Sequence, residues 1–215
     1  MNGSRALRRI ALLVGALGSV SCSDFTGSTT PADRGASGLS LPPRAVGVAF
    51  TYLGEQARAK AVRWGASHLT VEERVSSIVG PEGGSLSLPG SDFTMTIPEG
   101  ALPAPTLITV ISKGGAHVAY DMQPHGLVFQ KPVTVVQQLR RTSSYGTSEG
   151  NGIRSAYLPD GNEAIAPDDS ATPTELAAGA TYFQGTANVA ETHVWYLSHF
   201  SRYILISGVW MLEPE

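Results

Sequence analysis

From residue 76 onward, apolar and polar residues alternate in short runs that turn signals separate. Residues 85–88 read Ser-Leu-Ser-Leu before a Pro-Gly pair, and residues 93–97 read Phe-Thr-Met-Thr-Ile before Pro98. Alternation with a period of two places successive side chains on opposite faces of a strand. The pattern predicts an all-β fold, an antiparallel β-sandwich. Further strands are expected at 107–111, 118–122, 132–136, 154–158, 192–197 and 203–207.

Local composition refines this prediction. The run at 107–111 is apolar on both faces, which suits a central strand. Pro132 is expected at the start of its strand, where the missing N–H is tolerated. Loops are predicted at 142–152, which is rich in Ser, Thr and Gly, and at 163–180, which is rich in Asp, Pro and Ala.

The segment 46–75 is ambiguous. Residues 46–53 are apolar enough for a strand, whereas residues 56–64 carry Ala57, Lys60, Ala61 and Trp64 at helical spacing. We therefore expect a short helix at 56–64, and we expect Trp64 to pack part of the segment against the sandwich.

The first 22 residues have the pattern of a signal peptide. Three Arg residues precede an apolar run from Ile10 to Val20, which is shorter than the ~20 residues that a membrane span needs. The run ends in Val20-Ser21-Cys22, which resembles a bacterial lipoprotein signal with a lipid-accepting Cys. Ser19 departs from that pattern, in which Leu is usual. The resemblance implies lipidation of Cys22 and membrane anchoring; the alternative is ordinary cleavage nearby with Cys22 as an incidental thiol.

Composition narrows the class of protein. The 215 residues include 24 Gly, 14 Pro and one Cys. Gly and Pro together make up about 18%, against a usual ~12%, which disfavours long helices. A single Cys excludes a disulfide framework and a thiolate zinc site. Residues 23–45 are rich in Ser, Thr, Gly, Pro and Ala, so a disordered flexible linker is expected there.

Charge argues against nucleic acid as a partner. The chain has 15 basic and 18 acidic residues. Removal of residues 1–22 takes away three of the 15 basic and none of the 18 acidic residues, which leaves a formal charge of −6. A nucleic-acid binder needs a basic face, and an acidic chain does not provide the expected footprint.

Two sequence blocks identify a family. One contains Gly83-Gly84, the run Ile97-Pro98-Glu99-Gly100-Ala101-Leu102, and Ile108-Thr109-Val110; the other is Pro124-His125-Gly126-Leu127-Val128-Phe129 followed by Lys131-Pro132-Val133. Together they resemble the ZU5 domain, known from ankyrins, netrin receptors, death-domain scaffolds and bacterial envelope proteins. The resemblance covers 76–208 and leaves 209–215 as a C-terminal tail. These positions are expected to maintain the fold, with Gly100 in a turn and Phe129 as an inward anchor.

The tripeptide His199-Phe200-Ser201 is the one candidate catalytic motif. In the ZU5 family, as in some unrelated folds, His-Phe-Ser at a strand turn is an autoproteolysis site. The resemblance implies that Ser201 attacks the Phe200 carbonyl while His199 acts as general base, and that water hydrolyses the resulting ester. The alternative is structural: on a regular strand His199 and Ser201 share one face, and Phe200 fills the core.

Other constellations are weaker. The five His residues show no zinc spacing. The acidic residues at 160–163 and 168–169 suggest calcium, although a solvated turn is the better interpretation. The run Val194-Trp195-Tyr196 would suit a sugar surface, although alternation favours burial of Trp195 or Tyr196. The pair Gly114-Gly115 lacks the Lys and Ser/Thr of a phosphate-binding loop. No cofactor or metal is expected.

The sequence therefore predicts a secreted lipoprotein anchored at the bacterial cell envelope through Cys22. Its expected function is structural or protein-interacting, with an unnamed protein partner at the envelope. One alternative is a domain that cleaves itself once between Phe200 and Ser201; another is an envelope module that binds glycan or calcium. Multiple-turnover enzyme activity is not expected.

Overall fold

A computed structural model describes residues 51–53, 57–66, 71–147, 152–159, 165–184 and 189–211. These residues form two antiparallel sheets, one of nine strands and one of five, and no α-helix. The predicted all-β class and sandwich are confirmed. None of the described residues belongs to a helix long and apolar enough to cross a membrane. The signal peptide and linker expected at 1–22 and 23–45, with Cys22, lie outside the described residues.

The five-stranded sheet contains much of the alternating sequence. Its strands follow the order β12-β13-β8-β5-β4. Their bounds are Gly84–Leu88 for β4, Phe93–Ile97 for β5, Val128–Gln138 for β8, Gly179–Gln184 for β12 and Val189–His199 for β13.

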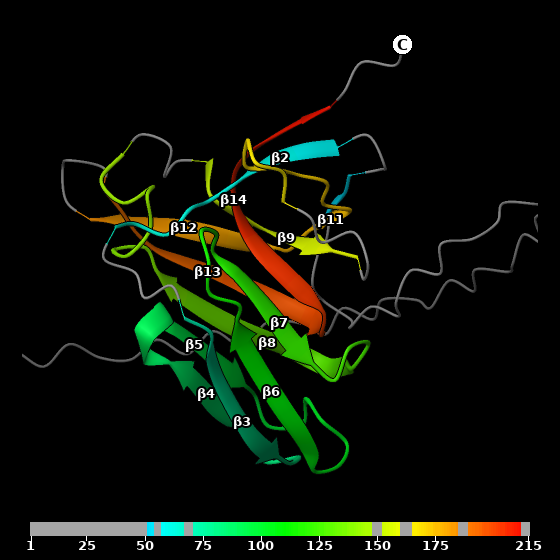
Figure 1. The fold of residues 1–215 in the computed structure, drawn as a ribbon. Helices are drawn as coiled ribbons and strands as arrows, with labels where there is room; N and C mark the ends of the chain where they lie inside the picture. Colours follow the sequence, from blue (N-terminus) through cyan, green and yellow to red (C-terminus); the bar gives the residue numbers. More distant parts are fainter. Residues whose placement is uncertain are drawn as a thin grey trace, which may run out of the picture. The chain divides into compact units, whose positions relative to one another are not determined.

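The nine-stranded sheet forms the second layer, and Figure 1 shows β3, β6 and β7 in front of β4, β5 and β8. Its main order is β1-β11-β9-β14-β7-β6-β3, while β2 pairs with β14 and β10. The bounds are Thr51–Tyr52 (β1), Ala57–Ala61 (β2), Glu73–Val79 (β3), Thr106–Ser112 (β6), Ala119–Gln123 (β7), Arg154–Leu158 (β9), Ser170–Ala171 (β10), Glu175–Leu176 (β11) and Arg202–Met211 (β14).

The strands predicted from alternation are present. Those at 93–97 and 154–158 have the predicted bounds, the one at 118–122 is shifted by one residue, and the others lie within longer strands. The expectation that 107–111 forms a central strand is confirmed, because β6 lies between β7 and β3, although the first residue of this run is exposed. Leu107 is 60% exposed and pairs across the strands with exposed Ile78.

The prediction of a short helix at 56–64 was wrong. Residues 57–61 form β2, in which Ala57, Ala59 and Ala61 are buried and the residues between them are not. Alanine has high helix propensity, but pairing of β2 with β14 and β10 overrides that preference. Trp64 is buried, as expected.

Two further expectations need correction. The loop predicted at 163–180 contains β10, β11 and the first residues of β12. Pro132 lies inside β8 rather than at its start, beside a shift in the β8–β13 register between Leu197 and His199. A proline is tolerated there because regular pairing is interrupted. Strand β3 begins at Glu73 and β14 ends at Met211, whereas the resemblance to ZU5 spans 76–208.

The residues that resemble the ZU5 motif occupy turns and the core. Gly100 has φ of 73° in the turn after β5, as expected. Gly83 has φ of 79°, and a Cβ at this position would lie 2.4 Å from the carbonyl oxygen of Ile97. Phe129 is 1% exposed and packs edge-on against Phe200, with ring centroids 4.7 Å apart. These residues maintain the sandwich.

A buried polar network joins the two sheets. The Tyr120 hydroxyl of β7 donates to Oε1 of Gln137 in β8, and Nε2 of Gln137 donates to the Ser91 carbonyl at 2.8 Å. Glu73 of β3 accepts hydrogen bonds from the amides of Gly90 and Ser91, each at 2.8 Å. These bonds fix the short 3₁₀ turn Pro89–Ser91 between β4 and β5 against the opposite sheet.

His193 is a buried, neutral histidine in the same core. Its two ring nitrogens lie 2.9 Å from the Thr181 hydroxyl and 3.0 Å from the Ser155 hydroxyl. A neutral imidazole offers one donor and one acceptor, which suits two hydroxyl partners. Burial, reinforced by the charge of Arg154, lowers the pKa of His193 to about 4.

We predict that Phe129→Ala lowers the free energy of unfolding by about 3–5 kcal/mol, because it leaves a cavity against Phe200. Urea unfolding measures the change. The matched control is Tyr182→Ala, whose side chain is 56% exposed; its effect should stay within about 0.5 kcal/mol. Equal losses in the two variants would contradict the assignment of Phe129 as the anchor.

We also predict that stability falls as the pH drops from about 6.5 to about 4. In that window the unfolded state binds a proton at His193 and the folded state does not, so the loss reaches about 3 kcal/mol at pH 4. Urea unfolding across this range, compared with His193→Gln, isolates the contribution. A pH dependence that is unchanged in His193→Gln would show that another group is responsible.

Candidate functional site

The His-Phe-Ser tripeptide lies where the chain passes from one sheet to the other. Strand β13 ends at His199, β14 begins at Arg202, and Phe200 and Ser201 join them. Figure 1 shows β13 and β14 meeting at one end of the sandwich. His199, Phe200 and Ser201 are 1%, 0% and 4% exposed. The predicted candidate residues therefore lie together in the interior.

Main-chain hydrogen bonds fix this crossing. The Phe200 amide donates to the Leu127 carbonyl at 2.8 Å, and the Gly126 amide donates to the Phe200 carbonyl at 2.9 Å. The Met122 amide donates to the Ser201 carbonyl at 3.0 Å. The carbonyl that self-cleavage would attack is thus already hydrogen-bonded to a main-chain N–H. Such a donor stabilises negative charge on the oxygen during acyl transfer.

The crossing departs from a regular strand. Phe200 and Ser201 belong to neither β13 nor β14, and all three tripeptide side chains are buried. The structural alternative placed Phe200 on the face opposite His199 and Ser201. Phe200 does fill the core, as that alternative expected, but Ser201 lies outside the strand that ends at His199.

His199 is surrounded by polar groups of the nine-stranded sheet. Its Nε2 lies 3.4 Å from the Tyr203 hydroxyl and 3.9 Å from Oε1 of Glu175. The Tyr157 ring packs edge-on against the imidazole, with centroids 5.3 Å apart. Glu175 is 3% exposed, so its carboxyl group shares a buried environment with the imidazole.

The Tyr203 hydroxyl stays protonated in this environment. Burial, together with the charge of Glu175, raises the pKa of Tyr203 well above its usual value. The hydroxyl lies 3.2 Å from the His199 carbonyl, to which it donates. Tyr203 therefore serves as a neutral donor that positions the backbone just before the Phe200–Ser201 bond.

The nucleophile and base are near neighbours in sequence but are not hydrogen-bonded in this state. Within the described residues, no hydrogen bond joins the Ser201 hydroxyl to His199, whose Nε2 faces Tyr203 and Glu175. Catalytic hydrogen bonds often form only as a reaction proceeds. Self-cleavage would therefore require a side-chain rearrangement that brings the two groups together.

Sequence reasoning missed three contributors to this site. Glu175 fell in a predicted loop, Tyr203 was assigned only to a strand, and Gly126 was treated only as a motif residue. The Pro-x-Gly motif containing Gly126 was the one available signal. Nothing in local periodicity places Glu175 beside His199, which is 24 positions further along the chain.

The other candidate residues have protein partners or lie outside the described chain. Asp169 bonds Arg63 and His117, each at 2.8 Å, and Asp168 bonds the Ser170 hydroxyl at 2.7 Å. Residues 160–163, the rest of the acidic stretch, lie outside the described residues.

The side chains of Trp195 and Tyr196 on β13 lie on opposite faces of the five-stranded sheet. Trp195 is fully buried, whereas Tyr196 is 39% exposed. The alternation in this part of the sequence had predicted burial of one of the two.

Comparison with models of known protein families found no match, and comparison with curated proteins found none either. The ZU5 resemblance therefore stays a prediction that rests on the sequence motifs.

Proposed function

We propose that this chain is a cell-envelope lipoprotein that presents a ZU5-like sandwich as a protein-interaction module. The lipoprotein-like signal ending at Cys22 supports membrane anchoring, and the linker composition of 23–45 supports a tether. The binding part of the proposal rests on one structural observation, the outer face of the five-stranded sheet.

Where its strands alternate regularly, that outer face carries no charged side chain at the outward positions. The charged residues of the described strands, exposed Lys131 of β8 and half-buried Glu191 of β13, lie at the register shifts. The cross-strand register places Thr134 beside Tyr196, Val136 beside Val194, and Thr192 beside Tyr182. Small hydroxyl side chains continue the surface across β4 and β5. In the regularly paired stretches the outward residues are Ser85, Ser87, Thr94, Thr96, Thr134, Val136, Gln138, Ala180, Tyr182, Thr192, Val194 and Tyr196.

Such a surface is suited to association with a protein. Interface centres are depleted of charge and enriched in Tyr, which supplies a large contact area with little conformational freedom to lose. Tyr182 and Tyr196 are 56% and 39% exposed. The chain has a formal charge of −6 after loss of residues 1–22, so a face without charged side chains in its regularly paired stretches contrasts with the acidic character of the whole chain.

We predict that a photo-crosslinking amino acid at position 196 yields adducts with an envelope protein in the source cells. The matched control is position 78 on the other sheet, where Ile78 is 71% exposed. Thr134→Lys should remove the adduct by placing a charge beside position 196, with little effect on stability because Thr134 is only partly buried. Gel shifts and mass spectrometry identify the products. Equal adducts at 78 and 196, or adducts that survive Thr134→Lys, would refute the proposed surface.

Self-cleavage at Phe200–Ser201 is a second candidate, favoured by the Gly126 amide on the Phe200 carbonyl. The Ser201 hydroxyl would attack that carbonyl, with its proton passing to His199 and then to the departing Ser201 nitrogen. The C–N bond breaks and an ester forms; water then hydrolyses the ester to a Phe200 carboxylate and a free Ser201 hydroxyl. The fragment 201–215 contains β14, whose pairing with β2, β7 and β9 would retain it in the sheet.

The corresponding prediction is that denatured mature protein yields two masses, a chain ending at Phe200 and a fragment starting at Ser201. Ser201→Ala should abolish cleavage, whereas Ser198→Ala, at a neighbouring buried serine, should not. The mass of the larger chain also reports lipid on Cys22. A single uncut mass from folded protein would exclude self-cleavage and leave the interaction proposal intact.

A further inference from the structure

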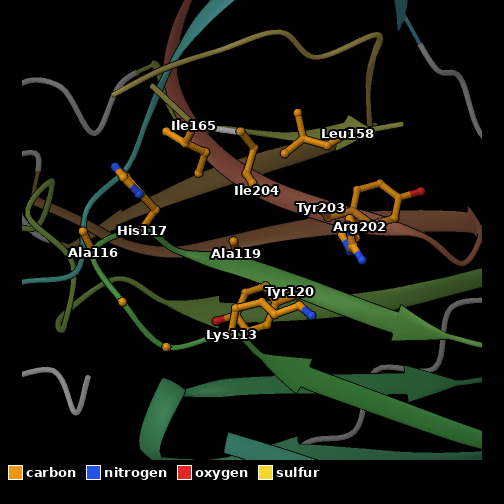
Figure 2. A pocket seen from close by; sticks show the side chains of 12 residues that line it. Lys113, Ala116, His117, Ala119, Tyr120, Leu158, Ile165, Arg202, Tyr203 and Ile204 are labelled. Carbon is orange, nitrogen blue, oxygen red and sulfur yellow. The ribbon is translucent and has the colours of Figure 1, made fainter. Parts of the chain in front are cut away.

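A hollow on the outer face of the nine-stranded sheet combines an apolar floor with a cationic rim. Its volume is about 410 Å³, within the range of small-molecule sites. Figure 2 shows it between β7, β14 and the loop that follows β6. The hollow lies on the nine-stranded sheet, whereas the uncharged outer face and β13 belong to the five-stranded sheet. An occupant of the hollow would therefore be a separate ligand.

The floor is built from the smaller of the two hydrophobic clusters. Ala119 of β7 pairs with Ile204 of β14, Leu158 of β9 pairs with Arg202 two residues earlier in β14, and Ile165 packs against this cluster. Leu158 and Ile204 are 4% and 2% exposed, so the accessible part of the floor comes mainly from Ala119 and Ile165. All four side chains are apolar, so the floor offers dispersion contacts and no side-chain hydrogen bonds. An apolar group of a ligand is the complementary occupant.

The rim carries more cationic than anionic groups. Lys113 and Arg202 lie 3.0 Å and 3.3 Å from Oδ2 of Asp121, and His125 bonds the other carboxylate oxygen at 2.6 Å. Burial opposes ionisation of this carboxyl, but the hydrogen bonds from His125 and Lys113 lower the pKa of Asp121 to about 2. One carboxylate thus faces two permanent cations.

On the opposite side of the hollow, His117 lies 2.8 Å from Oδ1 of Asp169, which Arg63 also binds at 2.8 Å. Lys113, Arg202 and His117 line the hollow, whereas their carboxylate partners Asp121 and Asp169 do not. This local excess of positive charge stands out on a chain whose formal charge is −6 without residues 1–22, and it would attract a small anion.

The loop beside Lys113 leaves the hollow open. Gly114 and Gly115 have φ of 68° and 88°, and a Cβ at Gly115 would meet nothing within 4 Å. Ala116 follows, so no bulky side chain closes this side of the hollow. The Lys113 side chain is 42% exposed, and its ammonium group is accessible to a ligand from solvent.

We infer that the hollow binds a small amphiphilic anion, a monocarboxylate with an aliphatic body. The body would lie on Ala119, Leu158, Ile165 and Ile204, while the carboxylate would face Lys113 and the Arg202 side of the rim. The floor selects for an apolar body, and the rim selects for one negative charge rather than a neutral head group. The inference does not depend on the interaction module or on self-cleavage.

Octanoate at pH 7 is a suitable probe, followed by ¹⁵N chemical shifts of the full folded domain. We expect saturable shifts at residues 113–119, 158 and 202–204, with no matching shifts on β4 or β5. Lys113→Met should weaken binding about tenfold, as expected for loss of one charge-assisted contact. Lys131→Met, which removes the same charge elsewhere, should leave binding unchanged.

Two further measurements test each half of the inference. Octanol, which has the same body without the charge, should bind at least about tenfold more weakly. Ala119→Phe should abolish binding by filling the hollow, while its spectrum reports whether the fold is retained. Absence of shifts at about 10 mM octanoate, equal binding of octanol, or equal losses in Lys113→Met and Lys131→Met would each overturn the inference.

Discussion

The passage of the chain from one sheet to the other at Phe200 is the constraint around which the sandwich is organised. A backbone segment that leaves one sheet inside a core loses its ladder partners, and each unpaired buried group would be costly. Here the Phe200 amide and carbonyl are both bonded, to Leu127 and Gly126, although Phe200 belongs to no strand. The aromatic ring then packs on Phe129, so side chain and main chain hold the same position.

This crossing accounts for irregular features nearby. The β8–β13 register shifts between Leu197 and His199 because β13 must turn out of its sheet, and Pro132 lies on the facing part of β8. Beyond the crossing, β14 pairs with β7 and β9 and later with β2. The second hydrophobic cluster lies on the outer side of that sheet. The five-stranded sheet has an uncharged outer face, so the two sheets present different chemistry to solvent.

The sequence was most informative where one local pattern decided the structure. Period-two alternation placed β5 and β9 correctly, and the family motif placed Phe129 in the core. Strand β2 was misread because its alanines fit a helix as well as a strand, and only pairing with β14 settles the matter. Strands β10 and β11 have two residues each, which is too short for any periodicity.

The candidate site shows the same limit. The tripeptide at 199–201 is contiguous, so its chemistry could be recognised from residue types alone. Glu175 and Gly126 reach it through tertiary structure, and no sequence pattern records that proximity. The hollow beside Lys113 was also missed, because its floor comes from β7, β9 and β14 and its cations were scattered along the sequence.

The polar cluster at the crossing consists of His199, Glu175 and Tyr203. Its polar contacts differ from those of the other buried polar residues in the core. His193 and Gln137 are buried, but each has hydrogen-bonded partners that suit a neutral group. Beside His199, a carboxylate is 3% exposed and lies 3.9 Å from the imidazole. Burying such a pair generally stabilises a fold no better than apolar residues of similar volume would. A module that only presents an outer surface has no need of this cluster, whereas self-cleavage needs a base near the Phe200–Ser201 bond, and His199 lies there beside Glu175 and Tyr203. The cluster is therefore the structural feature on which the proposal of self-cleavage rests, and that proposal is independent of what the outer face binds.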